Sequence, residues 1–335
     1  MGRPEELARL VQVDHTDEIS ALEETLLARI LGGLAAKFEQ LTGRSLKAWT
    51  VAFGSPDAPA VPGAALTRLL ASVRAAVRRL VGDLGSRAAT ALTDTLPSIA
   101  AAAAQQGSAF VRAAAGHTAR QATPRIPGRL KARATTMRDA ADERVRGSLA
   151  ALRARTVRRW SDVATGIGHA RAAVSTVEQH VATAVNEVVN ETLATTVRMV
   201  GEMRLWIAEA DACVTCSAYS GLVVDIDAAF PGGLSWDPVQ RVASAPAVIS
   251  PPVHPRCRCR VLPWSARWET GAVPLPLHLQ RQGRRNIAYG RARPSETRSA
   301  RIRAAAELLR SGVDLPPDVR AAAQRAVRNR RFAAA

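Results

Sequence analysis

Apolar residues recur every three or four positions through most of the first 200 residues, and this spacing constrains the fold more than any other feature. It is the period of an amphipathic α-helix. Hydrophobic residues make up 47% of the chain but aromatic residues only 4%. Most of the core must therefore be Ala, Leu and Val, which suits closely packed helices better than a sandwich or a barrel. The sequence predicts a mainly α protein with an elongated helical body.

The helices near the N-terminus can be placed from the same pattern. A first helix is expected over residues 17–38, with Thr16 or Asp17 as its N-cap. Prolines and small turn residues then fill residues 54–64, which predicts a linker. A second helix is expected over residues 65–84, with leucines and valines on one face and arginines mostly on the other.

The pattern also predicts where helices further along the chain are interrupted. Pro97 is expected to break one helix, because proline lacks the backbone N–H that a helix interior needs. The segment "TPRIPG" at 123–128 predicts a turn. Helical spacing then continues over residues 129–210, with interruptions expected at Gly147 and around residues 166–168.

All four cysteines lie in two short segments, "CVTC" and "HPRCRC". The C-x2-C spacing of Cys213 and Cys216 lets two thiolates reach one tetrahedral ion, and His254, Cys257 and Cys259 add three candidate ligands. Because five candidates serve four positions, the pattern predicts a structural zinc site without fixing its ligand set. Two alternatives stay open at this point: disulfides between the segments, and four reduced thiols without metal.

The chain around the cysteines differs in composition from the rest. Glycines and prolines are frequent over residues 211–268, and "GLVVDI" has the composition of a short strand. These features predict a small, loop-rich α+β unit with its own core. Asp225 and Asp227 alternate with apolar residues there, so we interpret them as the solvated face of a strand rather than as metal ligands.

Enzyme motifs that use such residues are missing from the sequence. No histidine begins the H-x-E of zinc deaminases, and H-E-x-x-H, a P-loop, G-x-S-x-G and a dinucleotide fingerprint are all absent. A cysteine nucleophile with His254 as its base is the catalytic alternative. Two thiols in C-R-C beside rigid prolines suit a structural staple better, so the sequence predicts a protein that is not an enzyme.

Positive charge is concentrated near the C-terminus. Residues 265–335 hold fifteen arginines and five acidic residues, which gives +10 of the formal net charge of +17. The segment predicts a basic helical tail, with helices from Ser295 to Gly312 and after Pro316. Such charge attracts a polyanion or an acidic protein surface. The candidate contacts to DNA or to an acidic partner are Arg281, Arg284, Arg285, Arg325, Arg328, Arg330 and Arg331.

The cysteine motif resembles the carboxy-terminal signature of the MuF-like minor head proteins, or head morphogenesis proteins, of tailed bacteriophages. A long helix ending in W-x-A-E-A-D leads into C-x2-C, and P-P-x-H-P-x-C-R-C follows, then L-P; the resemblance covers residues 170–265. Members often carry D-x-R-x-C at the first cysteine, whereas this chain has "EADACVTC". The matching residues are Cys213, Cys216, Gly221, Pro251, Pro252, His254, Pro255, Cys257, Arg258, Cys259, Leu262 and Pro263.

The resemblance implies a minor capsid component that acts in head assembly at the portal vertex. Its partners would be the portal protein and other capsid or scaffold proteins, and double-stranded DNA bound without sequence specificity. The alternative is a cytoplasmic zinc-containing nucleic-acid-binding protein. That alternative is disfavoured because neither a helix-turn-helix nor a zinc-finger spacing is present.

The remaining expectations concern location and domain organisation. No apolar run reaches the roughly 18 residues of a membrane span, and no secretory signal is visible, so a cytoplasmic protein without membrane contact is expected. The resemblance further implies the host cytoplasm during assembly and then the interior of the virion head. The sequence divides into an N-terminal helical element (1–53), a linker (54–64), a helical body (65–210), a cysteine-cluster unit (211–268) and a basic helical tail (269–335).

Overall fold

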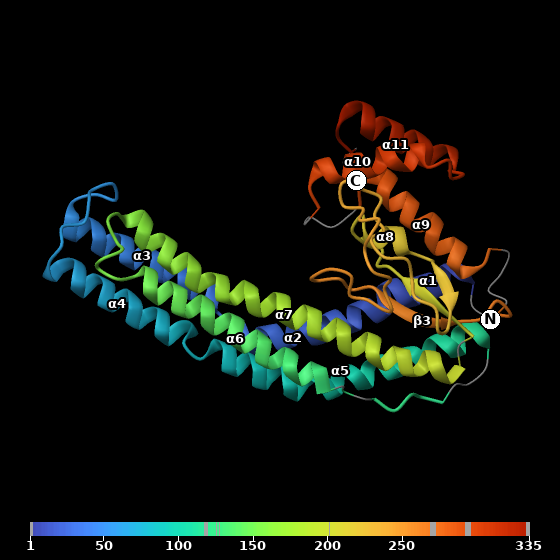
Figure 1. Cartoon of the computed structure of the whole chain (residues 1–335), viewed down its shortest axis with the longest axis horizontal. Coiled ribbons are helices and arrows are strands. Elements are labelled where there is room, and N and C mark those ends of the chain that lie inside the picture. The colour runs from blue at the N-terminus through green and yellow to red at the C-terminus, as the bar shows by residue number, and fades with distance from the viewer. Residues whose placement is uncertain are drawn as a thin grey trace. The chain divides into compact units, whose positions relative to one another are not determined.

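The computed structural model describes residues 3–116, 120–124, 126, 128–200, 202–268, 273–291 and 296–332. Over these residues the chain is mainly helical, with a three-stranded antiparallel sheet (Figure 1). The predicted fold class is therefore confirmed. The elements are α1 (Pro4–Arg9), the π-helical turn η1 (Leu10–Asp14), α2 (His15–Leu31), α3 (Leu34–Phe53), α4 (Ala64–Val81), α5 (Leu84–Ala115), α6 (Gly128–Ala151), α7 (Trp160–Val200), β1 (Met203–Ile207), α8 (Cys216–Tyr219), β2 (Val223–Asp225), β3 (Arg260–Trp264), α9 (Leu275–Tyr289), α10 (Arg298–Arg310) and α11 (Pro317–Asn329).

The chain forms two compact units, each assembled from separate stretches of sequence. Unit 1 comprises Met1–Ala21, Pro97–Ile126 and Val185–Ala335, and unit 2 comprises Leu22–Leu96 and Pro127–Ala184. Three of the four boundaries between the units fall inside α2, α5 and α7, and the fourth lies between α5 and α6. Neither unit is a contiguous block of sequence.

Unit 2 is built from helices whose apolar faces pack together. The apolar residues predicted on one face of the second helix are buried in α4, among them Leu66, Leu70 and Val77. This helix contacts both α3 and α6. Residues 54–63 join α3 to α4 without regular structure, and both helices belong to the same unit. Burial of these leucines and valines provides the main stabilisation, at about 1.5–3 kcal/mol for each large apolar side chain.

The expected first helix, 17–38, is in fact parts of two helices. α2 ends at Leu31, and Gly33 adopts a left-handed φ of 73° before α3 begins. The predicted N-cap is also wrong, because α2 continues directly from η1. The Thr16 hydroxyl instead accepts a hydrogen bond from buried Arg260, 3.1 Å away. A tertiary contact has taken the place of the expected local cap.

Two further interruptions were placed wrongly. α5 continues through Pro97, which coincides with a unit boundary rather than with a helix end; Leu96 and Ile99 are buried, and this packing offsets the lost hydrogen bond. The break between α6 and α7 falls at residues 152–159, not at Gly147 or residues 166–168. The helix after it ends at Val200, so residues 203–207, expected to be helical, form β1 instead.

Gly166 lies inside α7, where the side chain of Leu152 packs against it. A Cβ at this residue would lie 2.6 Å from the Leu152 side chain, so the glycine lets that leucine pack directly against the helix backbone. Within the predicted turn at 123–128, residues 123, 124 and 126 are not helical and Gly128 begins α6, while residues 125 and 127 lie outside the described residues.

The cysteine unit, residues 202–268, contains the sheet of unit 1. Strand β1 lies in the centre, with β2 and β3 antiparallel on either side, and Leu205 pairs with both Val223 and Leu262. The predicted strand in "GLVVDI" is β2. Within the unit the ring of Trp206 stacks on Tyr219 at a centroid distance of 4.6 Å, and Phe230 meets it edge-on at 5.0 Å. These rings form the local core that the sequence predicted.

Helices α9, α10 and α11 pack against one another at the C-terminal end of unit 1 (Figure 1). Both helices expected in the basic tail are present. Thr297 caps α10, its side chain accepting a hydrogen bond from the backbone N–H of Ala300; Ser295, the expected first residue, lies outside the described residues. Proline occupies the first turn of α11, as predicted. Among the described residues, no helix is both long and apolar enough to cross a membrane.

Candidate metal centre

The first cysteine segment forms a tight turn into the short helix α8. The backbone N–H of Cys216 donates to the Sγ of Cys213 at 3.3 Å, and the N–H of Ser217 donates to the carbonyl of Cys213 at 2.9 Å. A three-residue separation within this turn brings both sulfurs to the same side. The C-x2-C spacing thus places two ligand atoms together through local geometry alone.

The second segment turns sharply before β3. The backbone N–H of Cys257 donates to the carbonyl of His254 at 3.1 Å. Arg256 adopts a left-handed φ of 60°, which closes this turn and directs the chain into Cys257 and Cys259. The Nδ1 of His254 lies 2.8 Å from the carbonyl oxygen of Pro255. With Nδ1–H donating to that oxygen, Nε2 is free to face the first segment.

The five residues predicted as ligands come together. The Nε2 of His254 lies 3.1 Å from the Sγ of Cys213 and 3.0 Å from the Sγ of Cys216, and the Sγ of Cys216 lies 3.7 Å from that of Cys257. Two overlapping groups result, Cys213–Cys216–His254 and Cys216–Cys257–Cys259, with all ligand atoms in each group within 4.8 Å of one another. Cys216 belongs to both groups. All four cysteines are free thiols, so the disulfide alternative is not realised.

The cluster is embedded in the core of the cysteine unit. Cys216, Cys257 and Cys259 are buried beside the Trp206–Tyr219–Phe230 rings, whereas Cys213 and His254 are half-buried. One side of the cluster therefore contacts apolar core, and the other lies nearer to solvent. Burial of this kind favours a structural site over a freely accessible thiol.

The close approach of the sulfurs perturbs their proton affinities. The hydrogen bond from Cys216, together with His254, lowers the pKa of Cys213 to about 5, although burial opposes this shift. Burial alone would lower the pKa of His254, but its hydrogen bond with Cys213 and the negative charge there raise it to about 9. The hydrogen bond from Cys216 also holds the pKa of Cys257 well below its usual range. At neutral pH Cys213 and Cys257 are thus thiolates, whereas hydrogen bonds to these two sulfurs raise the pKa of Cys216, and burial raises the pKa of Cys259.

These residues fit a zinc ion. Zinc–sulfur bonds of about 2.3 Å in a tetrahedron place neighbouring sulfurs about 3.8 Å apart, close to the 3.7 Å between Cys216 and Cys257. Thiolate and imidazole nitrogen are the donors that zinc prefers in structural sites. Cys216 would be a ligand in either group, with three of Cys213, His254, Cys257 and Cys259 completing the tetrahedron. Four protein ligands would leave no open coordination position for catalysis.

Two asparagines of α7 hold the second segment in place. The side-chain amides of Asn186 and Asn190 both donate to the carbonyl of Cys259, at 2.9 and 3.0 Å, and the side-chain oxygen of Asn190 accepts from the N–H of Val261 at 3.0 Å. Both side chains are buried. Sequence reasoning missed them. The sequence could have revealed them, because two asparagines lie four residues apart on a valine-rich helical face. Polar groups buried on such a face need hydrogen-bond partners.

Buried Arg260 connects β3 to other segments of unit 1. Its guanidinium donates to the side-chain oxygen of Gln106 at 3.2 Å and to Thr16. Burial lowers its pKa to about 10. On the N-terminal segment, the Gln12 amide donates to the carbonyl of Ala208 at 2.6 Å. These contacts join residues more than 150 positions apart, and no local pattern identified them.

Gly221, part of the predicted motif, is required by the backbone. Its φ is 73°, and a Cβ there would lie 2.2 Å from the carbonyl oxygen of Pro276 on α9. Asp225 and Asp227 are exposed, as expected for the solvated side of a strand. The groups of candidate metal ligands found within the described residues do not include them.

The candidate arginines of the tail lie on two helices and just beyond. Of the seven, Arg284 is half-buried and the other six are exposed. Arg285 forms a 3.4 Å ion pair with Asp318, so part of its charge is neutralised within the tail. Burial lowers the pKa of Arg284, and the neighbouring Arg281 adds to this effect. The three arginines at 281, 284 and 285 belong to α9, Arg325 and Arg328 to α11, and Arg330 and Arg331 follow it.

Comparison of the chain with protein-family models, with curated proteins and with solved structures finds no match in any of the three. The geometry of the cysteine cluster is therefore the firmest guide to function.

Proposed function

We propose that the protein is a non-enzymatic assembly protein whose cysteine unit is stapled by one structural zinc ion, and that it acts as a minor head protein of a tailed bacteriophage. The zinc proposal is supported by one observation: five ligand-type residues lie together in one cluster beside the core, Cys213, Cys216, His254, Cys257 and Cys259. The resemblance of the surrounding motif to the MuF-like signature supports the phage role.

A structural role for the ion suits the construction of the cysteine unit. The segment between α8 and β3 contains only the short strand β2, so it offers few backbone hydrogen bonds for its length. A tetrahedral ion joining the first segment to the second would close this long loop and restrict the unfolded chain. The cluster lies against the aromatic core, where it would fix the position of both segments at once.

In the proposed role, the helical body binds portal, capsid or scaffold proteins in the host cytoplasm, and the protein then resides inside the virion head. The exposed arginines of the tail would contact packaged DNA through its phosphates, or an acidic face of a partner. Such phosphate contacts weaken steeply with salt and read no sequence. The alternative, a zinc-containing nucleic-acid-binding protein outside any particle, rests on the same zinc and the same arginines.

Zinc content tests the staple. Protein purified under reducing conditions should contain one zinc per chain by elemental analysis, and titration should recover four thiols after the metal is removed. Cys257→Ser should reduce the zinc content, and Thr215→Ala, which alters a non-ligand between Cys213 and Cys216, should not. Metal-free wild-type protein with unchanged thermal stability would contradict the proposal.

Co-expression with the portal protein encoded in the same genome tests the assembly role. We expect the chain to co-sediment with portal rings and to be present in low copy in purified particles. Zinc-loaded protein that binds double-stranded DNA strongly but never enters particles would instead favour the alternative. Protein that does neither would contradict both roles while leaving the zinc staple intact.

A further inference from the structure

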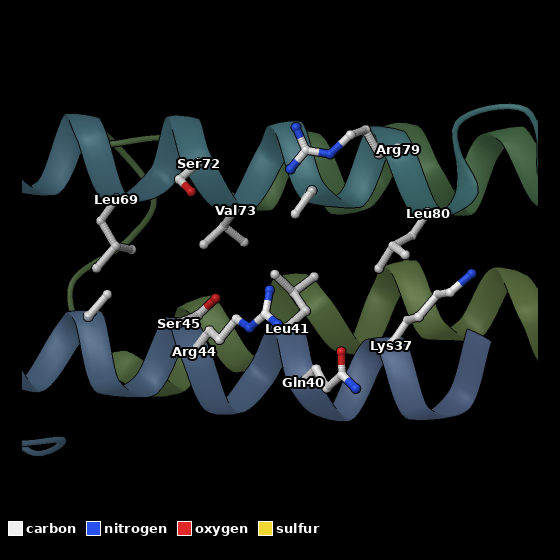
Figure 2. Close-up of a pocket in the computed structure, with 12 residues that line it drawn as sticks. Lys37, Gln40, Leu41, Arg44, Ser45, Leu69, Ser72, Val73, Arg79 and Leu80 are labelled. Atoms are coloured by element: carbon white, nitrogen blue, oxygen red, sulfur yellow. The ribbon is translucent and has the colours of Figure 1, made fainter. Parts of the chain in front are cut away.

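A groove between α3 and α4 of unit 2 is a second candidate binding site. It has a volume of about 340 Å³ and is lined by both helices (Figure 2). The lining positions recur every three or four residues, from Lys37 to Ala48 on α3 and from Leu69 to Leu80 on α4. At 1.5 Å per residue, this corresponds to a groove roughly 16 Å long, or about three helical turns.

The floor of the groove is largely apolar. Leu69 and Val73 of α4 are buried, and Leu41 of α3 and Leu80 of α4 are half-buried. Ser45 is only 5% exposed, and Figure 2 shows its hydroxyl directed into the space between the helices. It forms no hydrogen bond with any other described residue. The floor therefore offers an apolar surface together with the side chain of Ser45.

The edges of the groove are positively charged. Lys37 and Arg44 lie on α3 and Arg79 on α4; all three are exposed, and none pairs with an acidic side chain among the described residues. Arg44 extends into the space between the helices (Figure 2). Across both helices there are seven basic residues and one acidic residue, Glu39. An acidic partner would relieve this concentration of like charge.

We propose that this groove binds an acidic amphipathic helix of a partner protein. Apolar side chains of that helix would rest on the leucine and valine floor, and its carboxylates would pair with Lys37, Arg44 and Arg79, as in helix-in-groove recognition. The proposal goes beyond the assembly role and does not rest on it or on the zinc site, which belongs to the other unit.

The shape of the groove distinguishes this occupant from others. Half of the twelve lining residues are exposed, so the groove is open along its side, whereas a small-molecule pocket buries most of its ligand. A nucleic acid backbone would use the cations but not the apolar floor. The volume accommodates a row of side chains rather than a whole helix, which matches a partner helix lying across the opening.

A displayed library of random peptides of about 15 residues, long enough for a marginally stable helix, tests the proposal on zinc-loaded full-length protein. Selected peptides should carry aspartate or glutamate and apolar residues at helical spacing. Their affinity should fall about tenfold or more for R44E/R79E, because each reversed charge repels a carboxylate. The matched control R68E/R78E makes the same change in net charge on exposed α4 residues outside the groove and should weaken binding much less.

A second variant separates the apolar floor from the charges. Ala48 is exposed at the groove, so Ala48→Trp should fill the groove without disturbing the core and abolish binding, while thermal stability and zinc content stay at the wild-type level. The proposal is overturned if selection yields no binders, or if the peptides lack acidic residues. The proposal would also be overturned if R44E/R79E and R68E/R78E weakened peptide binding equally. A further contradicting result would be that an anionic detergent such as dodecyl phosphate binds in the groove while no peptide does.

Discussion

The cysteine unit and unit 2 are stabilised in different ways. Unit 2 consists of long helices whose alanines, leucines and valines pack along continuous faces. The cysteine unit has little regular structure, and it depends on a cluster of ligand-type side chains, three aromatic rings in contact and buried hydrogen bonds. Stability in the first is spread over many weak contacts, whereas in the second it is concentrated in a few groups. Mutations should therefore have graded effects in unit 2 and large effects in the cysteine unit.

The largest effect is expected for Cys216→Ser, because Cys216 is shared by both ligand groups. The variant should lose nearly all bound zinc and unfold the cysteine unit, since the binding energy of a structural zinc ion contributes directly to folding. Elemental analysis and near-UV circular dichroism of the tryptophans would measure this. The far-UV helical signal of unit 2 should largely persist, and its complete loss would show that the units do not fold separately.

Acid should destabilise unit 1 through His15. Burial, with a contribution from the charge of Arg260, lowers the pKa of His15 to about 4. The unfolded chain therefore binds a proton below about pH 6.5 that the folded state excludes until about pH 4. Over that interval, stability should fall by about 3 kcal/mol as the pH decreases. Urea unfolding across this range measures the free energy of unfolding, which should depend less on pH in His15→Gln than in the wild type. His169 is exposed, so His169→Gln should show the same pH dependence as the wild type.

The asparagines of α7 provide a finer test of the cysteine unit. Asn190→Ala removes the acceptor for the N–H of Val261 and one of two donors to the carbonyl of Cys259. A buried backbone group left unpaired costs about 1–3 kcal/mol. Asn186→Ala should cost less, because Asn190 still bonds the same carbonyl. Chemical denaturation of both variants measures the two losses in free energy of unfolding. A larger loss for Asn186→Ala than for Asn190→Ala would contradict this account of the contacts.

Two glycines of unit 2 should give effects of opposite sign, and the second gives the smallest effect. Gly166→Ala would place a methyl group against Leu152 and should destabilise the protein by about 1–3 kcal/mol. Gly168→Ala, two residues along the same helix, meets no atom within 4 Å. It should stabilise the helix by about 0.5–1 kcal/mol. Thermal denaturation distinguishes the two variants. Because the added methyl group clashes with the buried Leu152 side chain, the double variant Leu152→Ala/Gly166→Ala should lose less stability than the sum of the two single losses.

The cluster of candidate metal ligands was more accessible to sequence reasoning than its surroundings. C-x2-C is a local device, so the side-by-side sulfurs of Cys213 and Cys216 could be predicted from spacing alone. The partnership of His254 with both cysteines required only that the two segments meet. In contrast, the contacts of Asn186, Asn190 and Arg260 depend on which surfaces pack together. Spacing along the chain contains no information about that choice.

By itself, the sequence determined the helical class, the helices α10 and α11 of the basic tail, the strand β2 and the five candidate ligands, because each depends on periodicity or spacing within a few residues. The tertiary structure decided the rest. α5 continues through Pro97, Gly166 serves as a packing position inside α7, and residues 203–207 form the central strand of a sheet. In the first two cases, packing energy from distant residues exceeds the local preference of about 1–3 kcal/mol for ending a helix at proline or glycine. In the third, pairing of residues 203–207 with β2 and β3 overrides the helical pattern.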